Sequence, residues 1–84
     1  MKSKIVHIGV DVSKEKLDVF VPAQKEGMRP TAKELDNDVG GFRELRELAR
    51  KANATVCVEP TGGYELELVA FMHKFGYINR MYKR

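Results

Sequence analysis

The first 21 residues alternate apolar and polar positions in a pattern that predicts two β-strands. Residues 4–12 are rich in β-branched side chains, and one face of this segment would carry Val6, Ile8, Val10 and Val12. The other face would carry Ile5, His7, Gly9 and Asp11. Apolar residues on both faces are typical of a central strand. A polar turn at 13–15 leads to a second strand at 17–21, which Pro22 ends, so the chain is expected to open with a hairpin.

The middle of the chain predicts an edge strand and an amphipathic helix. Residues 23–30 are polar and include Gly and Pro, which indicates a loop, and residues 31–35 follow as a short third strand at the sheet edge. Asn37 or Asp38 can cap a helix. The apolar positions of that helix recur at helical spacing: Phe42, Leu45, Leu48, Ala49 and Ala52.

The last third predicts a strand, a second helix and a final strand. Residues 55–59 form a β-branched run typical of a parallel sheet covered on both sides. A turn at 61–63 leads into a helix that Gly76 ends, and residues 77–81 form the last strand. The apolar stripe of this helix is Leu68, Val69, Met72 and Phe75. The order β-β-β-α-β-α-β predicts an α/β fold with a mixed sheet, in which helices connect the later, parallel strands.

Composition limits the class of protein. The 84 residues are 43% hydrophobic and 32% charged, which suits one small domain. No apolar run approaches the roughly 20 residues that a membrane span needs, so a membrane protein is not expected. The apolar stretch at residues 5–10 is too short and too closely followed by an acid for a secretory signal, which predicts a cytoplasmic protein.

The excess of basic residues, 15 against 12 acidic residues, is concentrated at the C-terminus. No acid occurs from residue 74 onward, where the basic residues are Lys74, Arg80, Lys83 and Arg84. This segment could face phosphates or could be a charged tail, and charge alone favours the tail.

Two acids, Asp11 and Glu59, each end an apolar strand. If their strands are parallel neighbours, both carboxylates leave the same edge of the sheet with the strands about 4.8 Å apart. Oxygen ligands at that separation can share Mg²⁺ or Mn²⁺, the ions used for attack on phosphodiesters. Pro60 holds the preceding residue extended and so orients Glu59. The alternative interpretation is that both acids are solvated at the rim of the sheet.

The turn that follows Glu59 is a candidate nucleic-acid contact formed by Thr61, Gly62 and Tyr64. Glycines before a helix leave backbone N–H groups available to phosphate. The alternative is an ordinary tight turn in which Tyr64 covers the edge of the core, an interpretation slightly preferred to stacking on a base.

Three other residues have simpler interpretations. Asp18, flanked by apolar residues, is expected to be a solvated acid at the sheet edge rather than a metal ligand. His7 is expected to be a hydrogen-bonded structural histidine. Cys57 cannot form an internal disulfide and is expected to be a small buried apolar residue.

Several segments together resemble a known family. They are Gly9-Val10-Asp11-Val12-Ser13-Lys14 with Leu17-Asp18-Val19, then Gly41-Phe42 with Leu45, then Glu59-Pro60-Thr61-Gly62-Gly63-Tyr64. This set resembles the N-terminal part of the DEDD transposases of bacterial insertion sequences, of the Piv and IS-one-ten type. The resemblance covers nearly the whole chain and implies a ribonuclease H-like fold similar to the Ruv-type resolvases. It also implies that Asp11 and Glu59 are the first two catalytic, metal-binding acids of the tetrad.

The same resemblance implies a larger DNA-processing enzyme. The remaining two aspartates of the tetrad and a distal serine that attacks DNA belong to later parts of such proteins, and no Asp follows Asp38 here. Residues 1–84 are therefore expected to be a truncated, N-terminal piece of the catalytic domain, inactive alone. The expected partners are DNA and further copies of the chain, and use of a guide RNA by the full-length protein stays open.

Two other function classes remain as alternatives. An Asp at the end of the first strand also occurs in actin-like ATPases and sugar kinases, but these need a Gly-rich turn for phosphates. The turn Val12-Ser13-Lys14-Glu15 has no Gly and includes an acid, which disfavours ATP binding. The third class is an interaction module without catalytic activity, in which both acids are solvated.

Overall fold

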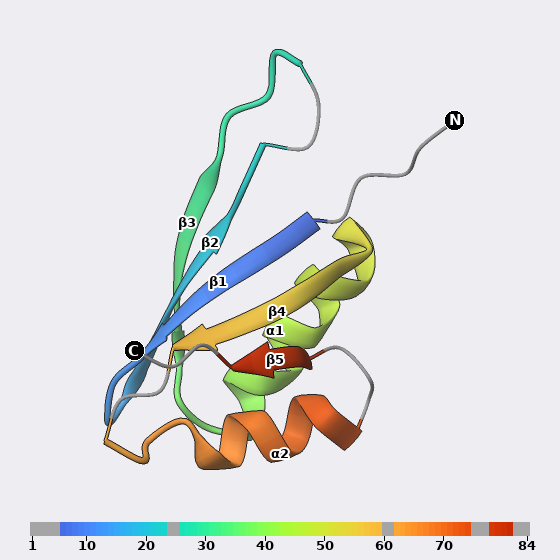
Figure 1. Ribbon diagram of the computed structural model, residues 1–84. Coiled ribbons are helices and arrows are strands. Elements are labelled where there is room, and N and C mark those ends of the chain that lie inside the picture. Colours follow the sequence, from blue (N-terminus) through green and yellow to red (C-terminus); the bar gives the residue numbers. More distant parts are fainter. Residues whose placement is uncertain (1–5, 24–25, 60–61, 75–77, 82–84) are drawn as a thin grey trace.

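The computed structural model describes residues 6–23, 26–59, 62–74 and 78–81, the last of these as backbone only. Five strands and two helices follow one another in the predicted order. The strands are β1 (Val6–Val12), β2 (Lys16–Val21), β3 (Thr31–Asp36), β4 (Ala54–Glu59) and β5 (Ile78–Met81), and the helices are α1 (Val39–Ala52) and α2 (Leu66–Lys74). Figure 1 shows the strands forming a single twisted sheet, with the two helices packed against it.

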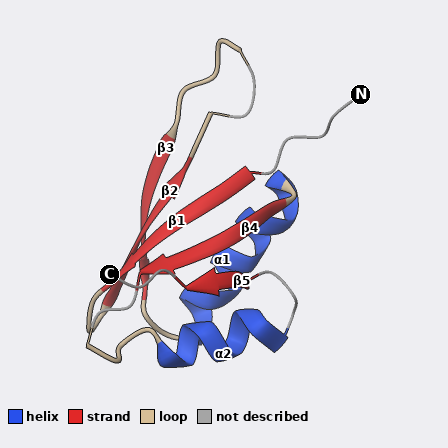
Figure 2. Cartoon of the chain, in the orientation of Figure 1, coloured by secondary structure: helices blue, strands red, loops and turns tan. Residues whose placement is uncertain are grey.

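The sheet is mixed, with strand order β3-β2-β1-β4-β5. β1 is the central strand, antiparallel to β2 and parallel to β4, and β5 continues the parallel part beside β4. β3 pairs antiparallel with β2 and forms one edge, while the β2–β3 hairpin extends away from the helices (Figure 2). The predicted opening hairpin, the central position of the first strand and the short edge strand are all confirmed.

One core lies between the sheet and both helices. Alternate residues of the strands point into it, among them Ile8, Val10, Leu17, Val19, Val56 and Val58. The helices contribute Phe42, Leu45, Ala49, Leu68 and Met72. The strand residues all belong to the same face, so both helices cover that face. The prediction that residues 55–59 are covered on both sides is therefore wrong within the described residues, because the crossover through α2 returns the chain to the side that α1 already occupies.

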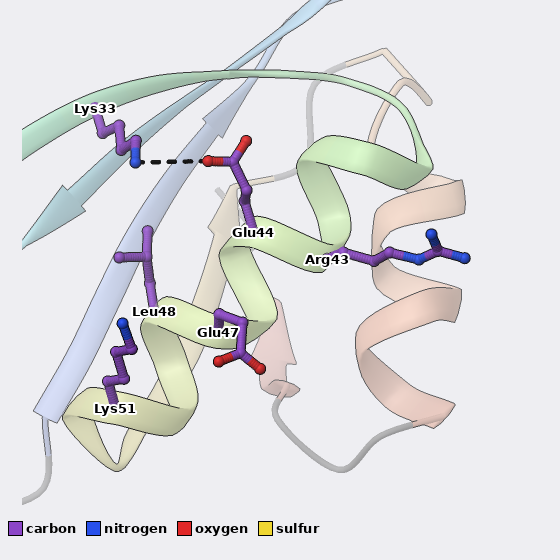
Figure 3. Close-up of a pocket in the computed structure, with 6 residues that line it drawn as sticks. All are labelled: Lys33, Arg43, Glu44, Glu47, Leu48 and Lys51. Atoms are coloured by element: carbon purple, nitrogen blue, oxygen red, sulfur yellow. Dashed lines mark ion pairs between the residues drawn. The ribbon is translucent and has the colours of Figure 1, made fainter.

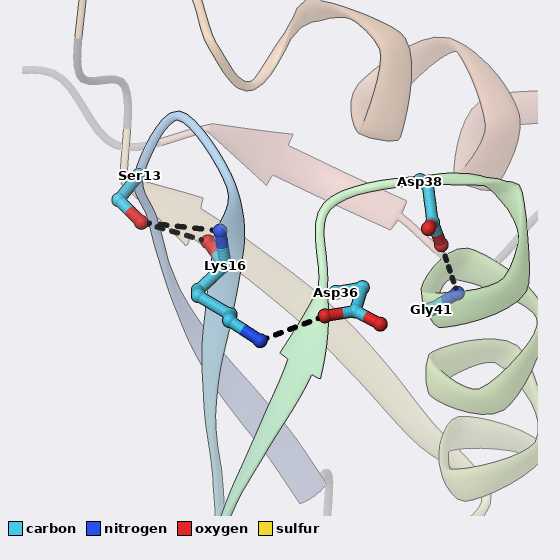
Figure 4. A network of polar contacts seen from close by, with 5 residues as sticks. All are labelled: Ser13, Lys16, Asp36, Asp38 and Gly41. Carbon is cyan, nitrogen blue, oxygen red and sulfur yellow. Dashed lines mark hydrogen bonds and ion pairs between the residues drawn. The ribbon is translucent and has the colours of Figure 1, made fainter.

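The start of α1 depends on a cap and a close backbone contact. Of the two predicted cap residues, Asp38 is the one that caps, since its Oδ1 accepts a hydrogen bond from the Gly41 N–H at 2.9 Å (Figure 4). Gly41 is buried, and a Cβ at this position would overlap the Asp36 carbonyl. The helix ends at Asn53, which adopts a left-handed conformation with φ 52°.

The second helix begins later than the sequence suggests. Residues 62–65 form turns, with Gly62 and Gly63 at φ 65° and 89°, and α2 begins only at Leu66. Two predicted features, the apolar Phe75 and the stop at Gly76, lie outside the described residues, as does Tyr77 of the last strand. Residues 62–65 therefore form turns of their own before α2 and are not its first turn.

Candidate carboxylate site on the open face of the sheet

Asp11 and Glu59 are register partners on neighbouring parallel strands. Asp11 is the penultimate residue of β1, and Glu59 is the last residue of β4. The prediction that the two acids lie on adjacent strands at the same edge is confirmed. Parallel neighbours in register place the two Cα atoms about 4.8 Å apart, which is close enough for both side chains to reach one ion.

Both acids lie on the face of the sheet that the helices leave open. Side chains alternate across a strand, and the residues flanking Asp11, namely Val10 and Val12, are buried on the helix side. Asp11 is consequently exposed, and Glu59, preceded by buried Val58, is half-buried. Because water reaches this face, the two carboxylates can be ionised without the large cost of burying a charge.

The acids extend into a row across four strands, which we call the acidic row: Glu59, Asp11, Asp18 and Glu34. Asp18 is the antiparallel register partner of Asp11, and Glu34 is the register partner of Asp18. Directly opposed residues share one face of a sheet, and like charges placed in this way repel each other. The row therefore creates a negative potential that favours a bound cation.

The sequence predicts Asp11 and Glu59 at the ends of their strands, but it does not show that Asp18 and Glu34 line up with them. Asp18 is exposed, as expected, yet it does not lie at the edge, because β3 covers the outer side of β2. Glu34 was not singled out at all. Counting back from a two-residue loop at 14–15, which the Ser13 and Lys16 pair closes, places Asp18 opposite Asp11, so the hairpin register was the signal that could have found this neighbour.

Two lysines on the strands that carry Asp18 and Glu34 pair with other acids. Lys16 Nζ donates to Asp36 Oδ1 at 2.8 Å, and this hydrogen bond, with the charge of Asp36, raises the pKa of Lys16 (Figure 4). Lys33 points to the helix side and pairs with Glu44 at 3.5 Å. In the ranges that the structure describes, no ion pair involves Asp11, Asp18 or Glu34.

The donor set is suited to a hard divalent cation but is only part of a cage. Carboxylate oxygens are the ligands that Mg²⁺ and Mn²⁺ prefer. Among the described residues, no three His, Cys, Asp or Glu side chains converge on one point. Two carboxylates in register would leave most coordination positions to water, substrate oxygens or ligands from elsewhere.

Two of the three predicted nucleic-acid contacts in the turn after β4 lie among the described residues, Gly62 and Tyr64. Gly62 is exposed and in the left-handed region, and Tyr64 has 49% of its surface exposed outside the core. Thr61 lies outside the described residues. Glu65, which sequence reasoning did not mention, is buried with 5% exposure, and its carbonyl accepts from the Val69 N–H at 2.9 Å. The described part of the turn thus exposes the backbone at Gly62 and the aromatic ring of Tyr64.

His7 and Cys57 meet on the same open face. Cys57 Sγ lies 3.4 Å from His7 Nδ1, and Cys57 is buried while His7 is exposed. The predictions of a buried cysteine and of a partnered histidine are confirmed. Cys57 nevertheless belongs to the face opposite the main core, because it alternates with Val56 and Val58.

A shallow hollow of about 320 Å³ lies elsewhere, between α1 and β3 (Figure 3). It is lined by Lys33, Arg43, Glu44, Glu47, Leu48 and Lys51. Glu47 accepts a hydrogen bond from Arg50 that lowers the pKa of Glu47, and Glu44 pairs with Lys33. Three basic and two acidic side chains alternate around this hollow, so neither sign of charge dominates it enough to indicate a particular ligand.

Comparison with known proteins adds no relative. No family model matches the chain, and no curated protein matches its sequence. Neither helix of the described part is long and apolar enough to cross a membrane.

Proposed function

We propose that this chain is the N-terminal part of the catalytic domain of a metal-dependent DNA transposase or recombinase, and that Asp11 and Glu59 are its metal ligands. The observation that carries the proposal is the register of these two acids on adjacent parallel strands, on the open face of the sheet. The full-length protein would cleave and join DNA strands.

Three features support a ribonuclease H-like fold for this domain. The element order is β-β-β-α-β-α-β, the first strand is central, and the second strand is antiparallel to it. The resemblance of the motifs around Asp11 and Glu59 to the DEDD transposases adds to this argument. The fold by itself implies no activity, so the function rests on the two acids.

Asp11 and Glu59 would hold Mg²⁺ or Mn²⁺, each through a carboxylate oxygen. Such an ion supplies Lewis-acid activation of a phosphodiester and stabilises the charge that develops on its oxygens. The exposed position of Asp11 leaves space for water and a phosphate on the same side. Further carboxylates of the tetrad would come from later parts of the protein.

DNA is the proposed substrate, and the turn after β4 would contact its backbone. Gly62 would allow a phosphate to approach the main chain, and Tyr64 would pack against a sugar or base. Thr61 is proposed as a third contact on the motif alone. Acting on cellular DNA, the protein would work in the cytoplasm as a homo-oligomer, and a guide RNA is a further candidate partner.

The turn after β1 argues against ATP binding. The Ser13 N–H donates to the Lys16 carbonyl at 2.9 Å, and the Lys16 N–H donates to Ser13 Oγ at 3.2 Å. A phosphate-binding turn needs such amides free. Their engagement disfavours the actin-like and sugar-kinase class.

Mn²⁺ titration of the 84-residue chain, followed by calorimetry, tests the site. Asp11→Asn and Glu59→Gln should each weaken Mn²⁺ binding more than about tenfold, because each removes one of two charged ligands. Glu34→Gln is the matched control, since it removes an acid from the same row two strands away from Asp11. Equal weakening by all three variants would mean diffuse attraction to the acidic row, and the proposed site would be wrong.

The same chain should not nick DNA. Two carboxylates without the remaining ligands bind the ion weakly and cannot position it for in-line attack. Incubation with supercoiled plasmid and Mn²⁺ measures this. Nicking that Asp11→Asn abolishes would show that the two acids suffice.

A further inference from the structure

Asn37 joins the two turns that follow the acid-bearing strands. Its Nδ2 donates to the Ser13 carbonyl at 2.9 Å and to the Tyr64 carbonyl at 3.2 Å, with a longer contact to the Lys14 carbonyl at 3.4 Å. Its backbone N–H donates to the Glu15 carbonyl at 2.9 Å. One half-buried residue thus binds the β1–β2 turn and the turn between β4 and α2.

These two turns begin just beyond the candidate ligands. Ser13 is two residues after Asp11, and Tyr64 is five residues after Glu59. The ladder between β1 and β4 ends at the Asp11 and Glu59 pair. Beyond that pair, the contact through Asn37 connects the two chain segments.

Asn37 is itself held firmly in place. It lies between the end of β3 and the Asp38 cap of α1. Close packing of Gly41 against the Asp36 carbonyl brings the first turn of α1 onto this segment. The side-chain amide has two N–H donors and so can serve carbonyls of two different turns at once, which neither Asp nor Ala can do.

We propose that Asn37 is a positioning residue for the candidate metal site, which sets the separation of Asp11 and Glu59 by tying the two turns together. This inference rests on the proposed function. Asn37 touches neither the ion nor a ligand and acts only through the backbone segments that follow the ligands.

The experiment compares Asn37→Ala with Asp38→Ala in the 84-residue chain. Asp38→Ala removes the helix cap, at a cost of about 1 kcal/mol in stability, and leaves both turns untouched. The Asn37→Ala variant should bind Mn²⁺ about tenfold more weakly, the size of effect seen when a residue that orients a metal ligand is removed. The Asp38→Ala variant should bind Mn²⁺ with the affinity of the unmodified chain. Urea unfolding of both variants measures their stabilities, so that weaker Mn²⁺ binding is distinguished from general destabilisation. If Asn37→Ala does not fold, Asn37→Gln moves the amide outward by one methylene and replaces it in the comparison.

Amide hydrogen exchange gives a readout that does not depend on the metal. The Lys16 and Leu66 N–H groups donate within the two turns, to Ser13 Oγ and to the Gly63 carbonyl. Both N–H groups should exchange faster in the Asn37→Ala variant than in the unmodified chain. In the Asp38→Ala variant, the exchange rate of both should stay unchanged. Unchanged Mn²⁺ affinity in Asn37→Ala, or faster exchange in only one turn, would overturn the positioning role. If the unmodified chain shows no Asp11-dependent Mn²⁺ binding, the proposed function fails, and unchanged exchange would then show separately that Asn37 does not couple the turns.

Discussion

Asp18 faces two carboxylates at once, Asp11 on one neighbouring strand and Glu34 on the other. In the described part of the chain, no ion pair compensates this arrangement. A bound divalent cation would relieve the repulsion between these acids. The same repulsion should be measurable without a cation as a loss of stability.

Asp18→Asn should therefore stabilise the protein by about 0.2–1 kcal/mol, because it removes a like charge directly opposite two others. Urea unfolding at low ionic strength measures the gain. The gain should shrink in high salt, which screens charges on an exposed face.

A double-mutant cycle provides the control for this interaction. In an Asp11→Asn background, Asp18→Asn should give a smaller gain, because one of its two opposing charges is already absent. An equal gain in both backgrounds would show that Asp18 and Asp11 do not repel each other.

At the scale of the elements, the connection from β3 to α1 shows that helix propensity alone does not explain why a glycine occupies position 41 in the first turn of α1. A helix usually gains from replacing Gly by Ala, by about 1 kcal/mol. Gly41 in the first turn of α1 lies too close to the Asp36 carbonyl for this exchange. The tight packing also places Asn37 and Asp38 for their two separate roles.

Gly41→Ala should destabilise the protein by about 1–3 kcal/mol, since the Cβ must displace backbone in a packed region. Thermal or urea unfolding measures the loss. Gly40→Ala is the matched control in the same turn, where a Cβ would meet only Asp38 Oδ1 at 3.3 Å. Equal effects of the two variants would show that the close contact at Gly41 has no energetic consequence.

At the scale of the whole molecule, the two edges of the sheet differ. The edge strand β3 carries Lys33, Glu34 and Asp36, and charges of this kind oppose pairing with another strand. At the opposite edge lies β5, a strand of four residues beside β4. Face-to-face association through the acidic row would oppose like charges, so the β5 edge is the expected contact between copies.

The chain is therefore expected to self-associate in a concentration-dependent way through β5. Light scattering over a series of protein concentrations measures this. Added salt should leave the association largely unchanged, because backbone hydrogen bonds form the contact. A strict monomer up to the millimolar range would contradict the expectation.

Much of the fold followed from the sequence because local patterns specify local structure. The β-branched run from Val6 to Val12 predicted a central strand, and the helical spacing from Phe42 to Ala52 predicted an amphipathic helix. Pro22 marked the end of the second strand for a steric reason, since its ring has no N–H to donate to a ladder. The placement of Asp11 and Glu59 at strand ends was likewise visible in the chain, which is why the candidate site was found.

Only the tertiary structure decided which residues became neighbours. Strand order and register placed Asp18 and Glu34 in line with Asp11, and the packing of both helices on one side left that row exposed. The role of Asn37 depends on three segments meeting, since its partners lie 23 to 27 positions away along the chain. The spacing of hydrophobic residues sets the type of each element and which of its faces is buried. Hydrogen bonds between distant turns, by contrast, form only once packing has brought those turns together.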